Sequence, residues 1–487
     1  VDNQITNFGN PNRAAGDVNG DGFEDMILGS FYENNNSGAA YVLFGKSTGF
    51  SPPPDLDNLN VADGFRILGS DGADAGVSVS GGGDINGDGF DDLVVAAANY
   101  TRANNNEDPN VNIFSDGYVI FGKANNTDVQ LSAIDLGASD SVGFRLTGFK
   151  TIEYNTADSV ATGGDINGDG FDDVVFGSKQ STFGSGYIGA AYVVFGRESG
   201  FSNLDITDLN GTAGFSFTDS ARGYNSSTAY IGAAVSIGGD INGDGFDDLV
   251  VGAPGQNLYR NGVREYDGEA YVVFGRSDFS ANPEVQVNEL DGTNGFVATG
   301  LVAEQARTGT SVSSGGDING DGVDDFVIGA PGDGEGYGSA AGRAYVVFGK
   351  VGLGSSGTLD LVTLSGTNGF VLNGGASNDL AGTSVSITGD INGDGFDDVV
   401  VGAPSIGASV EAPLESDNGT VYVLFGDSNI SVPSDLGALN GVNGFAIEGV
   451  SSYNAGQAVA HAGDINGDGF DDLLISEPNN SSGVVFG

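Results

Sequence analysis

One nine-residue pattern carries most of the side chains that could bind a metal ion. The pattern, D-x-N-G-D-G-x-[DE]-D, occurs seven times, at spacings of 67, 81, 75, 77, 73 and 74 residues. At positions 1, 3, 5 and 9, each copy brings three carboxylates and one amide together within nine residues. Hard oxygen donors in a turning loop are the ligands that Ca²⁺ prefers. The pattern therefore predicts seven calcium sites along the chain.

The ligands of each site follow from their positions in the loop. Positions 1, 3, 5 and 9 offer side-chain oxygens, position 7 offers a backbone carbonyl, and the glycine at position 6 permits the sharp turn. The expected ligands are Asp17, Asn19, Asp21, Phe23, Asp25, Asp84, Asn86, Asp88, Phe90, Asp92, Asp165, Asn167, Asp169, Phe171, Asp173, Asp240, Asn242, Asp244, Phe246, Asp248, Asp317, Asn319, Asp321, Val323, Asp325, Asp390, Asn392, Asp394, Phe396, Asp398, Asp464, Asn466, Asp468, Phe470 and Asp472.

An EF-hand, a plain hairpin turn and a magnesium site each fit the loop less well than calcium. An EF-hand needs a glutamate at position 12 and flanking helices, but position 12 is apolar in all seven copies, as at Leu28 and Val95. A hairpin turn accounts for the glycines, but three carboxylates would repel one another without a cation. Magnesium prefers a rigid octahedron with several waters. Calcium in a β-hairpin loop is the better interpretation.

Position 8 is also acidic in every copy. Along a strand its side chain alternates in direction with that of position 9, so we expect it to face solvent or a neighbouring repeat and not the ion. The residues at this position are Glu24, Asp91, Asp172, Asp247, Asp324, Asp397 and Asp471.

Four short strands are expected around each loop. An alternating segment precedes it, as at 77–80; an apolar run follows it, as at 249–254; then come a strand ending in Phe-Gly, as at 270–275, and a segment opening with Gly-Phe, as at 143–148. These segments are rich in β-branched and aromatic residues and are bounded by turn residues. Four strands repeated about every 75 residues indicate a β-propeller, whereas β-solenoid repeats are much shorter.

We therefore expect an all-β fold, a single seven-bladed β-propeller over residues 1–487 with four antiparallel strands and one calcium loop per blade. The last repeat ends at its third strand, so residues 1–7 are expected to close the ring. The expected blades span about 8–69, 75–148, 157–218, 232–299, 308–373, 381–448 and 455–487.

The repeats resemble FG-GAP repeats, which form the propeller of integrin α subunits. Phe8-Gly9 and Gly252-Ala253-Pro254 carry the motif, and residues 329–331 and 402–404 repeat it, while residues 96–98, 177–179 and 476–478 depart from it. The resemblance implies a seven-bladed propeller with calcium between the first two strands of a blade. Integrin α subunits load only some blades, so a full ligand set in all seven is more typical of a bacterial protein.

Charge and composition exclude several classes of function. The chain has 66 acidic and 16 basic residues, a formal net charge of −50, and no cysteine. Such a charge repels nucleic acid and anionic membranes, and the absence of cysteine excludes disulfides and thiol chemistry. No run of about 18 apolar residues is present to insert into a membrane. We expect a monomeric module located outside the cell or at the cell surface.

A partner is expected on the face opposite the calcium loops, because variable loops on a rigid scaffold usually carry recognition. The longest insertions there are 97–116, 177–190, 219–232, 254–269 and 404–419. Tyrosine and arginine, which are favoured at binding hot spots, gather in two of them; packing within the loops is the alternative. The candidate residues for binding a protein or a glycan are Arg222, Tyr224, Tyr230, Tyr259, Arg260, Arg264 and Tyr266.

The sequence favours a non-catalytic adhesion or recognition module over two alternatives. A lectin-like propeller would repeat aromatic residues at equivalent positions, but the tyrosines differ from blade to blade. The accessory propeller of a polysaccharide-degrading enzyme is the other alternative, since similar propellers occur in some lyases and phospholipases. His461 is the single histidine, and a structural role is expected for it. No nucleophile motif or phosphate loop stands out, so no catalytic residue is assigned.

Overall fold

The computed structural model describes most of the chain. The described residues are 13–31, 33, 37–50, 54–70, 72–98, 113–125, 127–135, 142–151, 159–179, 182–183, 186–187, 189–219, 229–255, 257–260, 263–300, 306–332, 340–404, 418–430, 435–449, 454–476, 483–485 and 487. Within these residues almost all regular structure is β-strand.

Each repeat begins with two strands joined by the acidic loop. The first strands are β1 (Arg13–Gly16), β5 (Ala75–Gly83), β10 (Ser159–Gly164), β17 (Ala234–Ile237), β24 (Ser311–Ser314), β29 (Ser384–Ile387) and β33 (Ala458–Gly463). The second strands are β2 (Asp25–Ser30), β6 (Asp92–Ala97), β11 (Asp173–Ser178), β18 (Leu249–Ala253), β25 (Phe326–Ala330), β30 (Val399–Ala403) and β34 (Asp472–Ser476). The second strands are buried along their whole length, which explains why they read as unbroken apolar runs.

Two further strands complete the expected unit. The third strands are β3 (Ala39–Leu43), β7 (Ile113–Ile120), β14 (Ala190–Val194), β21 (Glu269–Val273), β26 (Arg343–Val347), β31 (Thr420–Leu424) and β35 (Gly483–Val485). The fourth strands are β4 (Gly64–Leu68), β9 (Gly143–Thr151), β16 (Gly214–Thr218), β23 (Gly295–Thr299), β28 (Gly369–Asn373) and β32 (Gly444–Glu448). All neighbours in this order pair antiparallel.

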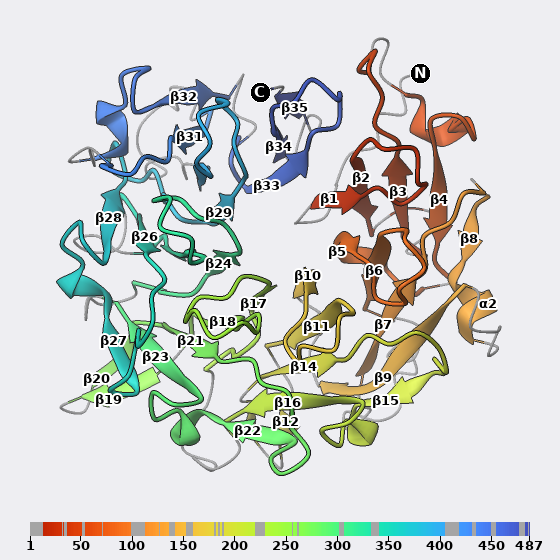
Figure 1. Ribbon diagram of the computed structural model, residues 1–487, viewed down its shortest axis with the longest axis horizontal. Coiled ribbons are helices and arrows are strands. Elements are labelled where there is room, and N and C mark those ends of the chain that lie inside the picture. Colours follow the sequence, from red (N-terminus) through yellow and green to blue (C-terminus); the bar gives the residue numbers. More distant parts are fainter. Residues whose placement is uncertain are drawn as a thin grey trace.

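The sheets stand around a common centre, with their first strands innermost (Figure 1). The hydrophobic core lies between neighbouring sheets, because alternate side chains of one strand face opposite neighbours. Leu93 and Val95 pack toward the first repeat, whereas Val94 packs toward the third. Met26 and Leu474 share a cluster that joins the first repeat to the last. The ring is therefore closed by side-chain packing.

The expectation of seven four-stranded blades is wrong. The described residues form six blades with four or more strands, not seven, and the last repeat forms only the three-stranded sheet β33–β34–β35. Among the described residues, no strand pairs with β35 on the side that a fourth strand covers in the other six blades. Residues 1–7, which were expected to supply that strand, lie outside the described residues.

The expectation of four strands per blade is also wrong for blades that have more than four strands. Four blades gain a short fifth strand, which pairs in parallel with the fourth strand and comes from the next repeat. These edge strands are β8 (Val129–Gln130), β15 (Leu204–Asp205), β22 (Glu284–Gln286) and β27 (Thr358–Asp360). They cover backbone groups that an open sheet edge would leave unpaired.

One-turn helices and two hairpins complete the described structure. The helices lie between the third and fourth strands: η1 (Leu56–Asn58), α2 (Leu131–Asp135), η3 (Ile206–Asp208), η5 (Val287–Glu289), η6 (Leu361–Thr363) and η7 (Leu436–Ala438). The hairpins β12 (Thr182–Phe183) with β13 (Gly186–Tyr187), and β19 (Asn257–Arg260) with β20 (Val263–Tyr266), extend connections between second and third strands. In the described part of the chain, none of the helices has the length and hydropathy that a membrane span requires.

Candidate functional site: the seven acidic loops

The first aspartate of each loop folds the turn. In the fourth repeat, Asp240 accepts hydrogen bonds from the backbone amides of Asp244 and Gly245, at 2.9 and 2.7 Å. Asp244 in turn accepts from the amide of Phe246 at 3.1 Å. The bonds to positions 6 and 7 recur in all seven loops. The loop conformation is therefore fixed by its own carboxylates.

The aspartate at position 9 is fully buried in all seven loops. Asp248 accepts hydrogen bonds from the amide of Ile241 at 3.1 Å and from the amide of Gly275 at 3.0 Å. Gly275 belongs to the Phe-Gly pair that ends the third strand. A Cβ at this glycine would collide with the carbonyl oxygen of Asp247. The same pair of bonds occurs in the other six repeats.

Carboxylates crowd one another around position 9. The pKa of Asp248 is raised to about 8, first by burial and then by the negative charges of Asp244 and Asp240. The pKa of every other position-9 aspartate is raised as well, with burial as the first cause. The amide nitrogen of Asn242 lies 3.4 Å from the Asp248 carboxylate. Positions 1, 3 and 5 therefore all lie near position 9.

The donor set fits calcium in its chemistry. All side-chain donors are oxygens, and their mutual repulsion is what a divalent cation would relieve. The carboxylates are nevertheless turned toward backbone amides, and no group of three acidic or histidine side chains among the described residues is gathered closely enough to hold a metal ion. Calcium therefore remains a prediction, supported by the donor types and their proximity.

The position-8 carboxylate connects each loop to the preceding repeat. Asp247 Oδ2 accepts a hydrogen bond of 2.8 Å from the amide of Asp165, which is position 1 of the loop before it. Five other repeats make the same bond, at 2.7–2.9 Å. In the first repeat, Glu24 lies against Gly463 of the last. Of the two expected surroundings of position 8, solvent or a neighbouring repeat, the structure shows the neighbouring repeat.

A second contact joins the loops at positions 4 and 7. A Cβ at Gly168 would meet the ring of Phe246 from the next repeat. The corresponding phenylalanine contact recurs at five other junctions, including that of Phe23 of the first loop with Gly467 of the last. At the remaining junction, Gly243 of the fourth loop meets Val351, and Val323 of the next loop lies farther away. The seven loops thus form one closed circle of contacts, in which every candidate ligand set touches its two neighbours.

Sequence reasoning missed the groups that hold the loops together. It did not identify the backbone amide of the Phe-Gly glycine as a donor to the aspartate at position 9. It also did not identify the glycine at position 4 as the residue against which the phenylalanine of the next repeat packs. It also missed why Phe-Gly and Gly-Phe recur together. In six blades their rings pack at 5.7–6.3 Å between centroids, as Phe274 does with Phe296. The regular recurrence of both dipeptides was the available signal.

The candidate partner residues are only partly described. Arg222 and Tyr224 lie outside the described residues. The other insertion is the hairpin β19–β20, in which Tyr259 and Arg264 are directly opposite in register. The amide of Gly255 donates to the carbonyl of Ala229 at 3.2 Å, so the bases of the two insertions meet.

Tyr230 has φ of 56°, and Asp74, Arg307, Leu380 and Asn454 take the same left-handed conformation at the equivalent position. Its backbone therefore has a role in the crossing between blades, whatever its side chain does.

His461 lies at the centre of the ring. Its Nε2 is 3.0 Å from Oδ1 of Asp471, the position-8 residue of its own repeat. Its backbone amide donates to Ser386 Oγ at 3.1 Å. Among these contacts, no nucleophilic side chain is aligned with the imidazole of His461. The structural role expected for His461 stays a prediction that these contacts support.

Comparison with known proteins agrees with the geometry. The FG-GAP repeat family matches residues 14–43, 75–110, 156–194, 231–273, 308–347, 381–424 and 455–486. The chain therefore belongs to the FG-GAP repeat family, in agreement with the resemblance drawn from its motifs. Its fold class is an all-β propeller.

Two kinds of curated relatives share these repeats. Integrin alpha-5 of Xenopus laevis is 30% identical over 249 residues, which are 50% of this chain and 19% of the relative. Phosphatidylinositol-glycan-specific phospholipase D of Rattus norvegicus is 35% identical over 180 residues, 37% of this chain and 19% of the relative. The chain thus spans about a fifth of the length of these relatives.

Among solved structures, a Dos1 propeller aligns with 95% of this chain and 76% of its own, at 12% identity and a TM-score of 0.37, which is too weak to bear on function. A bacterial origin stays a prediction.

Proposed function

We propose that this chain is a calcium-stabilised, non-catalytic adhesion or recognition module that acts outside the cell or at its surface. One observation carries the proposal: seven equivalent loops each bury an aspartate whose pKa is raised by burial and by neighbouring carboxylates. Such crowding is costly unless a cation neutralises it. The FG-GAP propeller shared with integrin alpha-5 supports the recognition role.

Each position of the loop would have its own role in holding the ion. The carboxylates at positions 1, 5 and 9, the amide oxygen at position 3 and the carbonyl at position 7 would hold the ion. Calcium supplies two positive charges, which would offset the repulsion among the three carboxylates. The hydrogen bonds from position 1 to the turn amides preorganise the loop before the ion binds.

The metal count tests this proposal directly. Crystals grown in calcium buffer should show seven anomalous peaks, one in each loop, and elemental analysis should find seven ions per chain. Three or fewer ions would contradict uniform loading. Replacing Asp244 with alanine should remove the ion of the fourth loop alone, because its carboxylate belongs to no other loop.

The partner surface is proposed to lie on the face opposite the loops. The bases of the insertions 219–232 and 254–269 meet where the amide of Gly255 donates to the carbonyl of Ala229. This contact supports one shared binding surface for the arginines and tyrosines of the two insertions. A glycan and matrix-protein array, run in calcium and in chelator, would identify the ligand. Binding that maps instead to the loop face would overturn this assignment.

A second function is favoured by the phospholipase relatives: the propeller could be the accessory domain of an enzyme. The described residues present one histidine–aspartate pair, His461 with Asp471, and no aligned nucleophile. Incubating the chain with a glycosylphosphatidylinositol-anchored protein tests whether the propeller itself is catalytic. Release of the protein that is lost in a His461→Ala variant would support catalysis by the propeller, and no release would exclude it under these conditions.

A further inference from the structure

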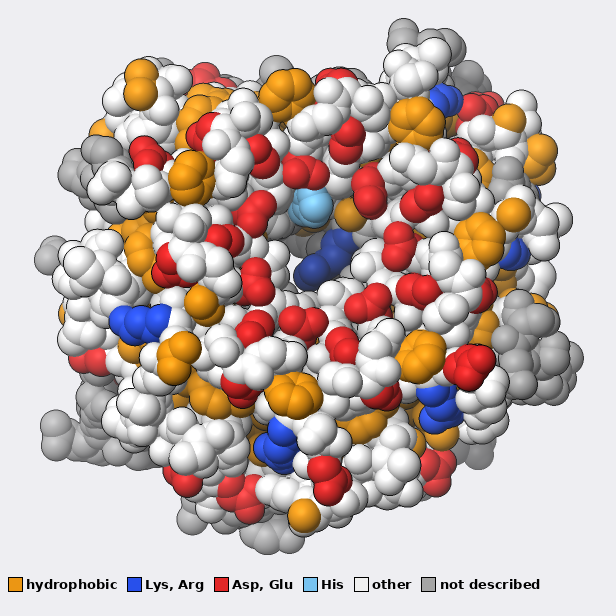
Figure 2. All heavy atoms as spheres, viewed as in Figure 1, with side chains coloured by type: hydrophobic (Ala, Val, Ile, Leu, Met, Phe, Trp, Pro, Cys, Tyr) orange, Lys and Arg blue, Asp and Glu red, His pale blue; other side chains and the backbone are white. Residues whose placement is uncertain are grey.

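A polar cavity occupies the centre of the ring. Its volume is about 680 Å³, and the first strands of all seven repeats line it. Figure 2 shows its mouth as a central hollow surrounded by acidic side chains, with a basic side chain at its floor. The acidic mouth contains position-8 residues: Glu24, Asp91, Asp247, Asp324 and Asp471. These carboxylates belong to the loop circle, but the floor of the cavity does not.

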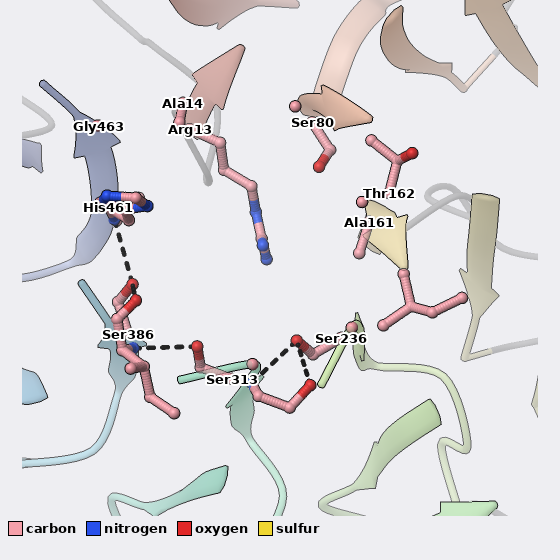
Figure 3. A pocket seen from close by; sticks show the side chains of 18 of the residues that line it. Arg13, Ala14, Ser80, Ala161, Thr162, Ser236, Ser313, Ser386, His461 and Gly463 are labelled. Atoms are coloured by element: carbon pink, nitrogen blue, oxygen red, sulfur yellow. Dashed lines mark hydrogen bonds between the residues drawn. The ribbon is translucent and has the colours of Figure 1, made fainter. Parts of the chain in front are cut away.

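Arg13 is the exception among the residues that line the floor. It lies four residues before the first aspartate of its loop, where the other six repeats have Ser80, Ala161, Ser236, Ser313, Ser386 and Ala460. Small residues at this position leave the centre of the ring open. Arg13 instead extends its guanidinium into the cavity, as Figure 3 shows.

The guanidinium lacks a counter-charge among the described residues. Its Nε is buried and has no hydrogen-bond partner there. Burial lowers the pKa of Arg13, and no neighbouring carboxylate opposes that effect. An unpaired guanidinium at this position is stabilised by an anion or by water in the cavity. Arginine has a planar fork of donors that matches a carboxylate in two parallel hydrogen bonds.

The walls offer hydroxyl groups at fixed positions. Ser236 Oγ accepts from the amide of Ser314 at 3.1 Å, and Ser313 Oγ accepts from the amide of Ile387 at 3.0 Å. Ser80 points toward the same space (Figure 3), whereas Thr162 Oγ1 donates to the carbonyl of Asp173 at 3.1 Å. Among the described residues, no phenylalanine or tyrosine lines the cavity. The walls therefore suit a hydroxylated ligand and offer no surface for stacking an apolar ring.

We infer that the central cavity binds one small hydroxylated monocarboxylate, such as a sugar acid, with its carboxylate on Arg13. The hydroxyls of Ser80 and Ser313 face the ligand's own hydroxyls. The acidic mouth selects for a single negative charge, because dianions are repelled more strongly as they enter. A neutral sugar leaves Arg13 uncompensated. This inference does not depend on the ligand of the opposite face.

Calorimetric titration of the calcium-loaded chain tests the inference, with D-glucuronate as the probe. We expect one glucuronate per chain, and binding of D-glucose and of sulfate that is weaker by about tenfold or more, which is about 1.4 kcal/mol. The test variant is Arg13→Ser, which copies the residue of four other repeats and should fold. It should weaken glucuronate binding by about tenfold or more.

Arg66→Ala is the matched control, since it removes a guanidinium from the outer strand β4, where Arg66 pairs with Asp128 at 2.6 Å. It should bind glucuronate like the unchanged chain. Equal binding of glucose, equal binding by Arg13→Ser, or no binding at concentrations up to about 50 mM would each overturn the inference. A melting temperature raised by glucuronate in the unchanged chain, but not in Arg13→Ser, would support it.

Discussion

At the scale of single residues, the buried aspartate of each loop has two competing states. A proton favours its buried side chain in the absence of metal, and the proposed calcium ion would take the place of that proton. Asp248 shows why, because burial removes water from its carboxylate while Asp244 and Asp240 keep a negative potential around it. The same chemistry recurs at six other loops, so the effect of pH on the whole chain should be large.

The metal-free chain should lose stability as the pH rises. The folded-state pKa of Asp248 is about 8, above its ordinary value of 3.8, so the folded chain holds this proton more tightly than the unfolded chain. That contribution is fully present below the ordinary pKa and is lost as the pH rises through the raised one. In chelator, melting temperatures should therefore be higher at about pH 6 than at about pH 9.

In calcium the opposite trend is expected, because protons compete with the ion for the same carboxylates. The gap between the melting temperatures in calcium and in chelator should narrow as the pH falls. Asp248→Asn should remove part of the pH dependence in chelator, since the amide does not titrate. Parallel curves in calcium and chelator across the whole pH range would contradict this account.

At the scale of elements, the loops act as connectors between blades as well as candidate metal sites. The Gly-Ala-Pro segments have an analogous role at the other end of the second strands that carry them. A Cβ at Gly252 would collide with the carbonyl of Gly309 in the next crossing. The two family motifs therefore mark where blades approach one another at either end of the sheet.

Substitutions of two glycines in the third loop can separate the cost of the blade contact from the cost of backbone strain. Gly168 and Gly170 both have positive φ, of 73° and 92°, but only Gly168 faces the ring of Phe246 from the next blade. Gly170→Ala should cost about 1–2 kcal/mol through its backbone alone. Gly168→Ala should cost about 1–3 kcal/mol more, through overpacking. Chemical denaturation measures the difference, and equal costs would exclude a role for this contact in stability.

The arginines in the insertions of the opposite face are predicted to bind the partner. Replacing Arg222, Arg260 and Arg264 together with alanine should weaken binding of the ligand that the array identifies, with little change in melting temperature. The control removes three positive charges that follow Phe-Gly at the loop face: Lys123, Arg276 and Lys350. If the control weakens binding as much as the test variant, long-range charge and not the proposed surface is responsible.

At the scale of the whole molecule, the net charge and the way the ring is closed both affect the stability of the fold. The formal net charge is −50, and seven calcium ions would reduce it to about −36. The ring has no covalent closure among the described residues. It depends on packing between the first and last repeats, where Glu24 meets Gly463 and Phe23 meets Gly467. Repulsion within the loops therefore acts on the same contacts that hold the ring together.

Removing calcium should therefore destabilise the whole fold. At a concentration of about a hundred times Kd, a ligand adds roughly 2.7 kcal/mol per site. Several sites together exceed the net stability of a typical domain, about 5–15 kcal/mol. Chelator should lower the melting temperature by tens of degrees or unfold the chain. Low-millimolar calcium should restore it, and equal magnesium should do so poorly.

A single-site variant shows how far the effect spreads. Asp244→Ala should cost a few kcal/mol and leave the other sites occupied, because each repeat touches only its neighbours. Calorimetry with and without chelator, with metal analysis of the variant, provides the measurement. Melting curves that overlay with and without chelator would show that the carboxylates are tolerated without an ion, and would defeat the stabilising role.

Local features of the chain could be predicted from the sequence because they depend on nearby residues. The nine-residue loop, the buried run after it and the Phe-Gly strand are each fixed within about 30 residues by turn chemistry and strand pattern. The direction of the position-8 side chain also followed, since Asp247 and Asp248 must point to opposite sides of a strand. The propeller class and the candidate ligands were therefore available from the sequence alone.

Only the tertiary structure decided which repeats touch and what that contact does. The bond from Asp165 to Asp247 joins residues 82 apart, and no local pattern specifies which loop lies next to which. The parallel edge strands, the three-stranded last sheet and the central cavity depend in the same way on how the ring closes. In the sequence, Arg13 stands where other repeats have serine or alanine. Its position at the shared centre of all the blades, without a counter-charge among the described residues, follows from their arrangement in space.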